Sequence, residues 1–364
     1  MTPRNNSGTK PVARFQRGLF AIVVPWILSS SVHANPGERK IDLAPGYRVD
    51  PTWPDKPPEY KWFRMAGIAV DAKDQIWTLN RGNMPVQVYR QDGKLVKAWG
   101  EGLFKLAHQI RIDHEGSVWI ANANSHVVQK FTPAGQLLLT LGTPDEPGED
   151  ETHMNRPTDM AISPTGDVFV ADGYGNNRIV HFDSRGRFVK AWGKHGIHAG
   201  ELNLPHAIAM DSRGRLYVVE RNNVRIQVFD QNGESLARWS NLINPWGICV
   251  TPDDHVLVCG SSPMRWTENS MLGAPPKDQM VIRFDRDGQP LELWTFPLAR
   301  SSRAEPGTLH WAHGIDVDSL GNLYLGDVGD DATANFRAQK FIRLPSGVGH
   351  NHDRSRSDRN APIR

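Results

Sequence analysis

Three histidines of this chain occupy equivalent positions in an internal repeat. Each stands directly before a short apolar run that opens a repeat, and the six residues at this position are Ala66, His108, Thr158, His206, Trp246 and His313. Histidine therefore recurs in every second repeat, although the chain has only 14 histidines in 364 residues. If six repeats form a ring, three imidazoles at one height converge on its axis, which predicts a metal site.

The ligand set indicates which metal chemistry to expect. Three neutral nitrogens leave the fourth position of tetrahedral zinc open, as in catalytic rather than structural zinc sites. Such an ion acts as a Lewis acid for an alkoxide, carboxylate or hydroxide. Copper, iron and cobalt accept the same ligands and stay open as alternatives. His310 is a rival third ligand, but it lies outside the repeated position, which favours His313.

Three more residues are expected near the same face, because each follows the second strand of its repeat. They are Arg81, Tyr174 and Arg221, from repeats one, three and four. Arginine can hold a carboxylate by two parallel hydrogen bonds, and a tyrosine beside a cation loses its proton more readily than in water. Taken singly, such residues usually form surface ion pairs or pack in loops. Beside a metal, they predict a site for an anionic hydroxy compound.

The elements that position these residues are six β-rich repeats. Each opens with an apolar-x-apolar segment, usually ending in Asp, and these segments are residues 67–71, 109–113, 159–163, 207–211, 247–251 and 314–318. A polar turn and three further strand patterns follow, except in the last repeat, so each repeat predicts a four-stranded antiparallel sheet. The spacings of 42, 50, 48, 40 and 67 residues match one propeller blade per repeat, with an insertion at 263–278 in the fifth.

The predicted fold is therefore all-β, a six-bladed β-propeller over residues 35–345. The repeats over residues 67–344 resemble those of the NHL-repeat propellers. The sixth repeat ends after its third strand at 339–343. A strand near residues 41–49 must then complete that blade, and closing the ring removes exposed sheet edges.

Both ends of the chain are expected to lie outside the propeller. Residues 1–34 carry four basic residues, no acid and a ten-residue apolar run at 19–28. This pattern predicts a cleaved secretory signal ending at Ala34 and a secreted or periplasmic protein; a membrane anchor is the less favoured alternative, because the run is too short to span a bilayer. Residues 346–364 are expected to be a disordered tail. We expect a monomer without a stable membrane span.

The net charge also bounds the function. The formal charge of +2 falls to −2 without the four basic residues of the signal, which argues against a nucleic-acid partner. Two cysteines exclude a disulfide scaffold or a Cys-rich zinc module. Cys249 and Cys259 flank a turn, and a disulfide between them is an open alternative in an oxidising compartment.

Several stretches resemble the peptidyl-α-hydroxyglycine α-amidating lyases. They are RG at 81–82, AHQI at 107–110, RPTD at 156–159, DGY at 172–174, NRIV at 177–180, LPH at 204–206, Arg221 with RIQ at 225–227, and His313 with GD at 326–327. The resemblance implies that the three histidines bind zinc, that Tyr174 is the base, and that Arg81 and Arg221 bind and polarise the substrate. The implied reaction cleaves the N–Cα bond of a C-terminal α-hydroxyglycine and gives an amide and glyoxylate without a redox cofactor.

The sequence also departs from that family. The family's calcium ion is held by two carbonyls, which correspond to Ile68 and Ile110, and by an aspartate that is Gly314 here. Calcium binding should be weakened, although Asp159 could substitute. A methionine on the substrate side of the family's site corresponds to Trp311 here. The cysteines that form disulfides in the animal enzymes of the family correspond to Asn155, Gly175, Tyr217 and Val228.

Two other functions stay open. A metal-dependent propeller hydrolase of the lactonase or arylesterase type would more often use carboxylates and Asn around calcium. A non-catalytic NHL-repeat binding protein of the cell envelope would need none of these site residues. The substrate expected for the lyase is a small molecule or peptide with a terminal carboxylate.

Overall fold

The computed structural model describes residues 46–262, 279–297, 299, 305–329 and 337–344. The predicted signal with its cleavage after Ala34, the insertion at 263–278 and the tail at 346–364 lie outside the described residues. Within these residues, 24 strands form six four-stranded antiparallel sheets, and helix is confined to one short 3-10 turn, η1 (Ala123–Ser125). The predicted six-bladed β-propeller is confirmed.

The first three blades follow the chain from β2 to β13. Blade one comprises β2 (Met65–Val70), β3 (Ile76–Asn80), β4 (Val86–Tyr89) and β5 (Leu95–Trp99). Blade two comprises β6 (Ala107–Ile112), β7 (Val118–Asn122), β8 (Val127–Phe131) and β9 (Leu137–Leu141). Blade three comprises β10 (Asp159–Ile162), β11 (Val168–Asp172), β12 (Arg178–Phe182) and β13 (Phe188–Trp192).

The last three blades follow in the same order around the ring. Blade four comprises β14 (Pro205–Met210), β15 (Leu216–Glu220), β16 (Arg225–Phe229) and β17 (Ser235–Ser240). Blade five comprises β18 (Asn244–Val250), β19 (Val256–Ser261), β20 (Gln279–Phe284) and β21 (Pro290–Phe296). Blade six comprises β22 (Ala312–Val317), β23 (Leu323–Asp327), β24 (Ala338–Arg343) and β1 (Tyr47–Asp50).

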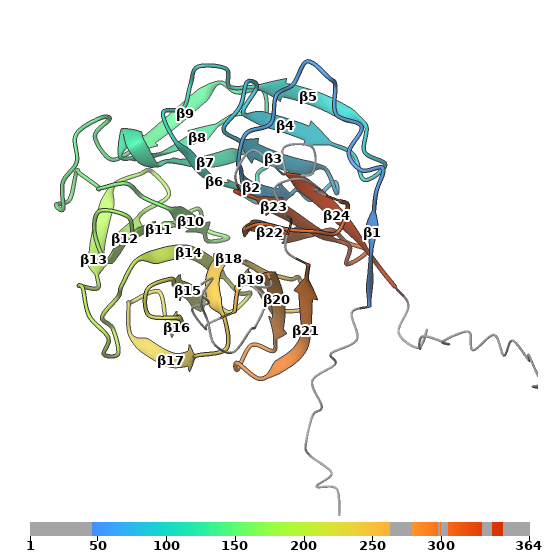
Figure 1. Ribbon diagram of the computed structural model, residues 1–364. Coiled ribbons are helices and arrows are strands. Elements are labelled where there is room, and N and C mark those ends of the chain that lie inside the picture. Colours follow the sequence, from blue (N-terminus) through green and yellow to red (C-terminus); the bar gives the residue numbers. More distant parts are fainter. Residues whose placement is uncertain (1–45, 263–278, 298, 300–304, 330–336, 345–364) are drawn as a thin grey trace, which may run out of the picture. The chain divides into compact units, whose positions relative to one another are not determined.

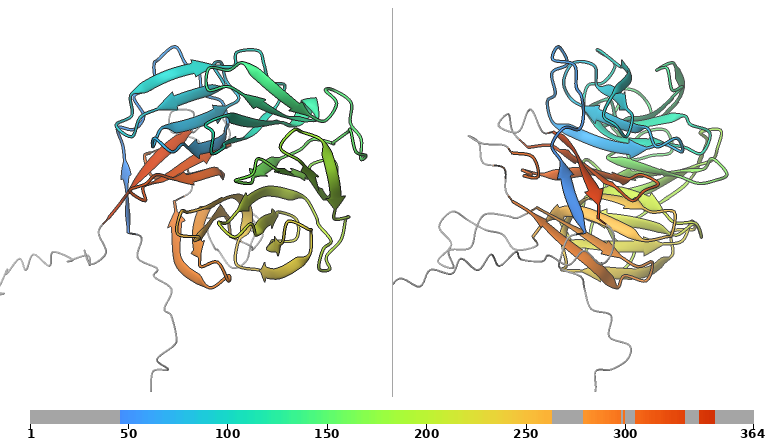
Figure 2. Two further views of the ribbon diagram at one scale, coloured as in Figure 1. Left: turned by 180° about the vertical axis from the view of Figure 1, so that it is seen from behind. Right: turned by 90° about the vertical axis from the view of Figure 1, so that its right-hand side faces the viewer.

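Blade six closes the ring with a strand from the opposite end of the sequence. β1 pairs antiparallel with β24, and Tyr47 lies opposite Arg343 while Asp50 lies opposite Lys340. The first strands of neighbouring blades contact one another all around the ring, including β22 with β2 (Figures 1 and 2). A strand from this end of the sequence therefore closes the ring as predicted, at Tyr47–Asp50, and covers the edge of β24 by pairing; residues 41–45 of the predicted range 41–49 lie outside the described residues.

The repeated aspartate forms the turn between the first and second strands. In blade two, the carboxylate of Asp113 accepts hydrogen bonds from the backbone N–H groups of Glu115 and Ser117 and from Nε1 of Trp119. Gly116 in this turn has a φ of +82°, a conformation that glycine adopts at little cost. One carboxylate thus accepts hydrogen bonds from two backbone N–H groups of the turn and from the tryptophan of the second strand. This explains the repeated Asp in the sequence.

The hydrophobic core lies between neighbouring blades. Each of the six buried apolar clusters joins residues of two adjacent blades. Tryptophans of the outermost strands contribute: Trp99 lies 5.4 Å from the ring of Phe131 in the next blade, and Trp239 lies 5.2 Å from that of Phe284. Because the apolar faces are buried only between sheets, the ring holds its inner strands at fixed positions around the axis.

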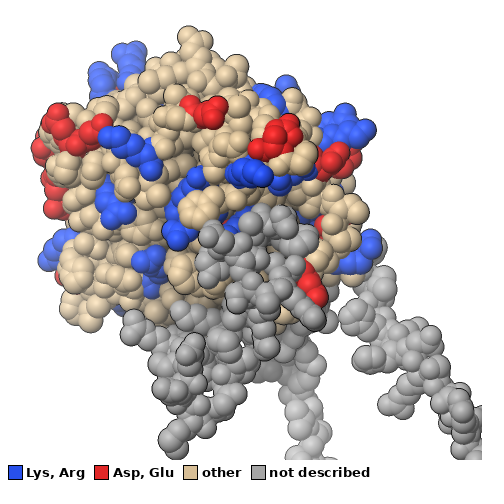
Figure 3. All heavy atoms as spheres, turned by 45° about the horizontal axis from the view of Figure 1, so that its top comes forward, with Lys and Arg blue, Asp and Glu red and all other residues tan. Residues whose placement is uncertain are grey.

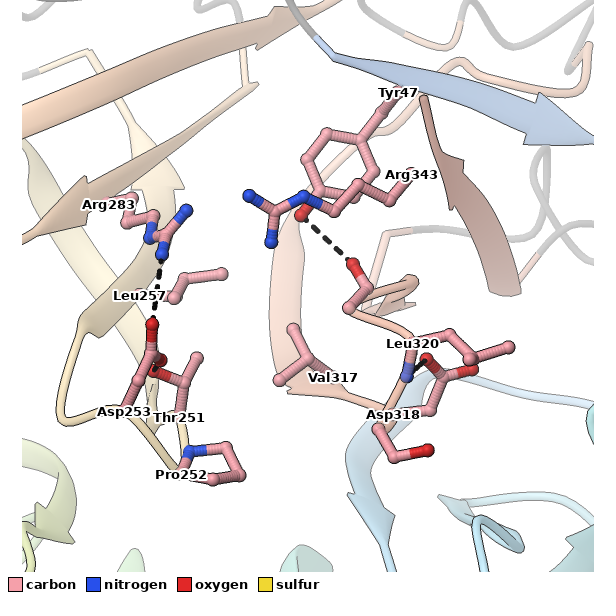
Figure 4. A pocket seen from close by; sticks show the side chains of 12 residues that line it. Tyr47, Thr251, Pro252, Asp253, Leu257, Arg283, Val317, Asp318, Leu320 and Arg343 are labelled. Carbon is pink, nitrogen blue, oxygen red and sulfur yellow. Dashed lines mark hydrogen bonds and ion pairs between the residues drawn. The ribbon is translucent and has the colours of Figure 1, made fainter. Parts of the chain in front are cut away.

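A cleft of about 270 Å³ lies between blades five and six, and its lining does not include the repeated histidines (Figure 4). On one wall, Arg283 pairs with Asp253 at 3.4 Å. On the other wall, the hydroxyl of Tyr47 donates to the carbonyl of Gly321 at 3.1 Å, which holds the closing strand β1 against blade six.

The open alternative of a Cys249–Cys259 disulfide is corrected by the structure. Both cysteines are free and buried. The register of β18 and β19 places Cys249 opposite Leu257 and Cys259 opposite Gly247. The two thiols are therefore offset along the hairpin instead of facing each other.

Candidate metal centre

The inner strands of alternate blades bring three histidines together. His108 lies on β6, His206 on β14 and His313 on β22, and each is at most 2% exposed. Their ring centroids are 4.9–5.0 Å apart, and one ligand nitrogen from each lies within 4.8 Å of the others. These three buried side chains could hold a metal ion. His310, the rival in the sequence, is not part of this group.

Backbone carbonyls orient all three imidazoles. Nδ1 of His108, His206 and His313 lies 2.6 Å from the carbonyl oxygens of Thr158, Trp246 and Ala66, respectively. A carbonyl only accepts hydrogen bonds, so each Nδ1 carries the proton and each Nε2 keeps its lone pair. This is the usual outer support of a metal-bound histidine. The acceptors are the other three residues of the repeated position, each in the next blade.

The environment keeps the three imidazoles neutral. Burial, together with the neighbouring imidazoles, holds the pKa of His108 and that of His206 well below the ordinary value of 6.5. Burial and the positive charge of Arg81 lower the pKa of His313 to about 3. Neutral imidazole is the form that binds a metal, so the three histidines can bind a metal ion without first losing protons.

Tyr174 is positioned next to two of these histidines. It follows β11, and its hydroxyl oxygen lies 2.9 Å from Nε2 of His108 and 3.2 Å from Nε2 of His206. Gly173 makes this approach feasible, because a Cβ there would lie only 1.8 Å from the carbonyl oxygen of Pro205. The structure thus brings the predicted phenol to the open side of the three histidines.

The two predicted arginines flank the same site. Nε of Arg81 donates to the carbonyl of Ala107 at 2.9 Å, which leaves its two terminal nitrogens for other partners. The guanidinium of Arg221 lies 4.7 Å from the ring of Trp246 and 5.8 Å from that of Tyr174. Within the described residues, neither arginine forms an ion pair with a carboxylate. Two unneutralised cations beside the histidines favour an anionic ligand.

Other aromatic and basic side chains lie near the site, and of these Arg156 was not singled out as a site residue from the sequence. Arg156 places its guanidinium 5.2 Å from the ring of Tyr174. Trp246 stacks on Trp311 at 5.4 Å and 25° and also lies 5.5 Å from the ring of His206. Trp311 is 39% exposed, so it can contact a ligand. On the face of the molecule shown in Figure 3, Lys and Arg side chains are spread across the middle of the view, and Asp and Glu side chains lie mainly toward its upper part and edges.

A cleft of about 290 Å³ adjoins Arg81 between blades one and two. Its walls include Phe63, Arg64 and Phe104 as well as Arg81 itself. Ala107, the neighbour of His108, also lines this cleft. The site therefore has space beside it for a ligand larger than the group that reaches the histidines.

The residues expected to hold calcium do not fit that ion. A Cβ on Gly314 would lie 2.8 Å from the backbone nitrogen of Ile68, so the backbone leaves no room there for the family's aspartate. Asp159, which could have substituted, is already paired with Arg111 at 2.5 Å. The carbonyls of Ile68 and Ile110 thus have no carboxylate to complete the expected ligand set.

Comparison with known proteins gives the family. The NHL repeat family matches residues 154–182 and 202–229. NHL repeat-containing protein 3 of Homo sapiens is 32% identical over 324 residues, covering 83% of this chain and 86% of that protein. The chain belongs to the NHL-repeat family.

Relatives in this family include amidating enzymes. Peptidyl-glycine alpha-amidating monooxygenase B of Xenopus laevis is 35% identical over 331 residues, which cover 80% of this chain and 35% of that enzyme. A probable peptidyl-alpha-hydroxyglycine alpha-amidating lyase of Caenorhabditis elegans is 33% identical over 156 residues, 40% of this chain and 43% of that protein.

Solved structures confirm the propeller. A gluconolactonase from Xanthomonas campestris superimposes with a TM-score of 0.54, at 16% identity over 79% of this chain and 88% of that one. At this identity the likeness concerns the fold alone. No helix in the described part of the chain is long and apolar enough to cross a membrane.

Proposed function

We propose that this chain is an exported, zinc-dependent carbon–nitrogen lyase. It cleaves the N–Cα bond of a C-terminal α-hydroxyglycine, or of a related α-hydroxy amide, and releases an amide and glyoxylate. The observation that carries the proposal is the hydroxyl of Tyr174 at 2.9 and 3.2 Å from Nε2 of His108 and His206. A proton acceptor beside a three-nitrogen metal site suits a substrate that must lose a hydroxyl proton.

The metal would be held by Nε2 of His108, His206 and His313. These neutral nitrogens and an open coordination position match catalytic zinc. Zinc supplies a Lewis acid that polarises a hydroxyl or carbonyl oxygen. The carbonyl-bound Nδ1 atoms hold the three rings in place, so the ligand geometry exists before any ion arrives.

The chain's own residues carry the proton and charge changes. Tyr174, in its deprotonated form, accepts the proton of the substrate hydroxyl, and the electron pair left on the substrate oxygen forms the aldehyde carbonyl of glyoxylate. The Cα–N bond breaks, and its electron pair remains on the amide nitrogen, which takes up a proton. The reaction consumes no water and needs no oxidant. Arg81 and Arg221 hold the carboxylate and the developing negative charge.

Two further observations support the proposal. The site residues lie in a chain whose relatives include proteins named as amidating lyases and amidating monooxygenases. The basic and apolar pattern of residues 1–34 supports export. The human relative that covers most of the chain is named only for its repeats, so a non-catalytic binding protein is the competing function.

The test uses α-hydroxyhippurate, which contains the scissile group on a small benzoyl carrier. The lyase must release benzamide and glyoxylate in equal amounts, and both can be quantified by chromatography. A hydrolase acting on the amide would give benzoate instead. Zinc-loaded protein that releases no glyoxylate from this compound or from an α-hydroxyglycine peptide would overturn the lyase proposal and leave the metal site standing.

A further inference from the structure

The guanidinium of Arg111 lies among the inner strands of the propeller. It lies on β6, three residues after His108, and lines a cavity of about 210 Å³. Its Nε and Nη2 donate to the two carboxylate oxygens of Asp159 on β10 at 3.1 and 2.5 Å. Nη2 also donates to the carbonyls of Ile248 on β18 at 3.1 Å and Ile208 on β14 at 3.4 Å. One guanidinium therefore links the inner strands of four consecutive blades.

The carboxylate of Asp159 strengthens the same connection. It accepts hydrogen bonds from the backbone N–H groups of Ile208 at 3.0 Å and Met160 at 2.8 Å. The Asp159 side chain is fully buried, and that of Arg111 is 13% exposed. The charges are paired and each has several hydrogen-bond partners, which is the condition under which a buried ion pair is tolerated.

The groups around the guanidinium are those that a hard cation binds. Calcium takes carboxylate and backbone carbonyl oxygens, and Arg111 is bound by one carboxylate and two carbonyls. A second carboxylate, that of Asp316 on β22, lines the same cavity. It accepts hydrogen bonds from the N–H groups of Val70 on β2 and Val317, and so connects the two remaining blades.

We infer that the guanidinium of Arg111 replaces a calcium ion in the channel of this propeller. The chain carries its own cation between the blades, so its stability does not depend on bound calcium. Removal of the guanidinium leaves Asp159 and the carbonyls of Ile208 and Ile248 beside the cavity that Asp316 lines. That arrangement should bind calcium.

The experiment measures the melting temperature and calcium binding of the full chain, after dialysis against calcium-free buffer and at fixed zinc. Wild-type protein should neither bind calcium in a titration nor melt at a higher temperature in 5 mM CaCl₂, about the upper end of the concentrations that weak protein calcium sites require. Arg111→Ala should melt about 5–15 °C lower, because it leaves Asp159 buried without its partner. Calcium should recover much of that loss and bind at about one ion per chain.

Two controls separate a specific site from general effects of calcium. Arg90→Ala breaks an exposed pair with Asp92 and should change neither the melting temperature nor calcium binding. Asp316→Asn combined with Arg111→Ala should recover less on calcium addition than Arg111→Ala alone. Should Arg111→Ala fail to fold, Arg111→Lys keeps the charge and should fold without binding calcium.

The inference is overturned if wild-type protein binds one calcium ion per chain and gains several degrees in melting temperature. It is also overturned if Arg111→Ala has the same melting temperature as the wild type. Neither measurement requires lyase activity, so failure of the proposed function would leave this result unaffected.

Discussion

Substitution of Tyr174 by phenylalanine separates catalysis from folding. The change removes one oxygen atom and keeps the ring that lies 5.8 Å from the guanidinium of Arg221. Both nearby Nε2 atoms are acceptors, because the protons of His108 and His206 are on Nδ1. The single phenol proton can serve only one of them at a time, so in the metal-free protein the variant loses about one hydrogen bond.

The expected effects on stability and rate therefore differ widely. One hydrogen bond corresponds to about 0.5–1.5 kcal/mol of folding free energy, or a few degrees in melting temperature. Loss of the proton acceptor should lower kcat for glyoxylate release by about 10²–10⁴-fold, which is roughly 3–5 kcal/mol in activation free energy. Zinc content should not change, because the three histidines are untouched.

The assay is steady-state glyoxylate release from α-hydroxyhippurate, with zinc measured on the same preparation. Tyr47→Phe is the matched control: its hydroxyl also makes one hydrogen bond, to Gly321 in the cleft between blades five and six. That variant should lose similar stability and retain full activity. A zinc-loaded Tyr174→Phe enzyme with kcat within threefold of the wild type would refute the assigned role of this residue.

Three further predictions concern the scaffold. Burial raises the pKa of the Cys259 thiol to about 12 and that of Cys249 well above 9, so iodoacetamide at pH 8 should label both cysteines only after denaturation. Burial raises the pKa of Asp316 from 3.8 to about 6, so the folded state binds more protons than the unfolded state between these values. The free energy of unfolding should therefore fall by about 2 kcal/mol between pH 4 and pH 6.5, and Asp316→Asn should lack this slope in urea titrations. Gly314→Ala should lower the melting temperature, because the added Cβ would lie 2.8 Å from the backbone nitrogen of Ile68; unchanged melting would contradict the packing described for the inner strands.

The repeat made much of the fold and the site predictable. In a closed ring, residues at one repeat position lie at one height, so alternate histidines had to meet once the six blades were recognised. The same equivalence identified the missing strand of blade six, which β1 supplies. The carbonyls that accept from Nδ1 belong to the same repeat position, in Ala66, Thr158 and Trp246, and could have been found by the same reasoning.

Contacts between unlike repeat positions could not be predicted in this way. Arg111 reaches Asp159 and carbonyls of two further blades, and no periodicity in the sequence marks such a contact. The stacking of Trp246 on Trp311 depends on the packing of blade five against blade six. The sequence left a disulfide between Cys249 and Cys259 open, because proximity in sequence across a turn does not give the register, which pairs Cys259 with Gly247.

The central claim is that histidines on alternate blades hold one metal ion. Metal analysis of purified protein tests it most directly, with His206→Ala compared with His181→Ala. His181 is a buried histidine outside the three ligands, and its Nε2 lies 3.0 Å from the carboxylate of Asp167. We expect about one zinc per chain in the wild type and in His181→Ala, and loss of most of that zinc in His206→Ala. Wild-type protein without a transition metal, or equal zinc in both variants, would contradict it.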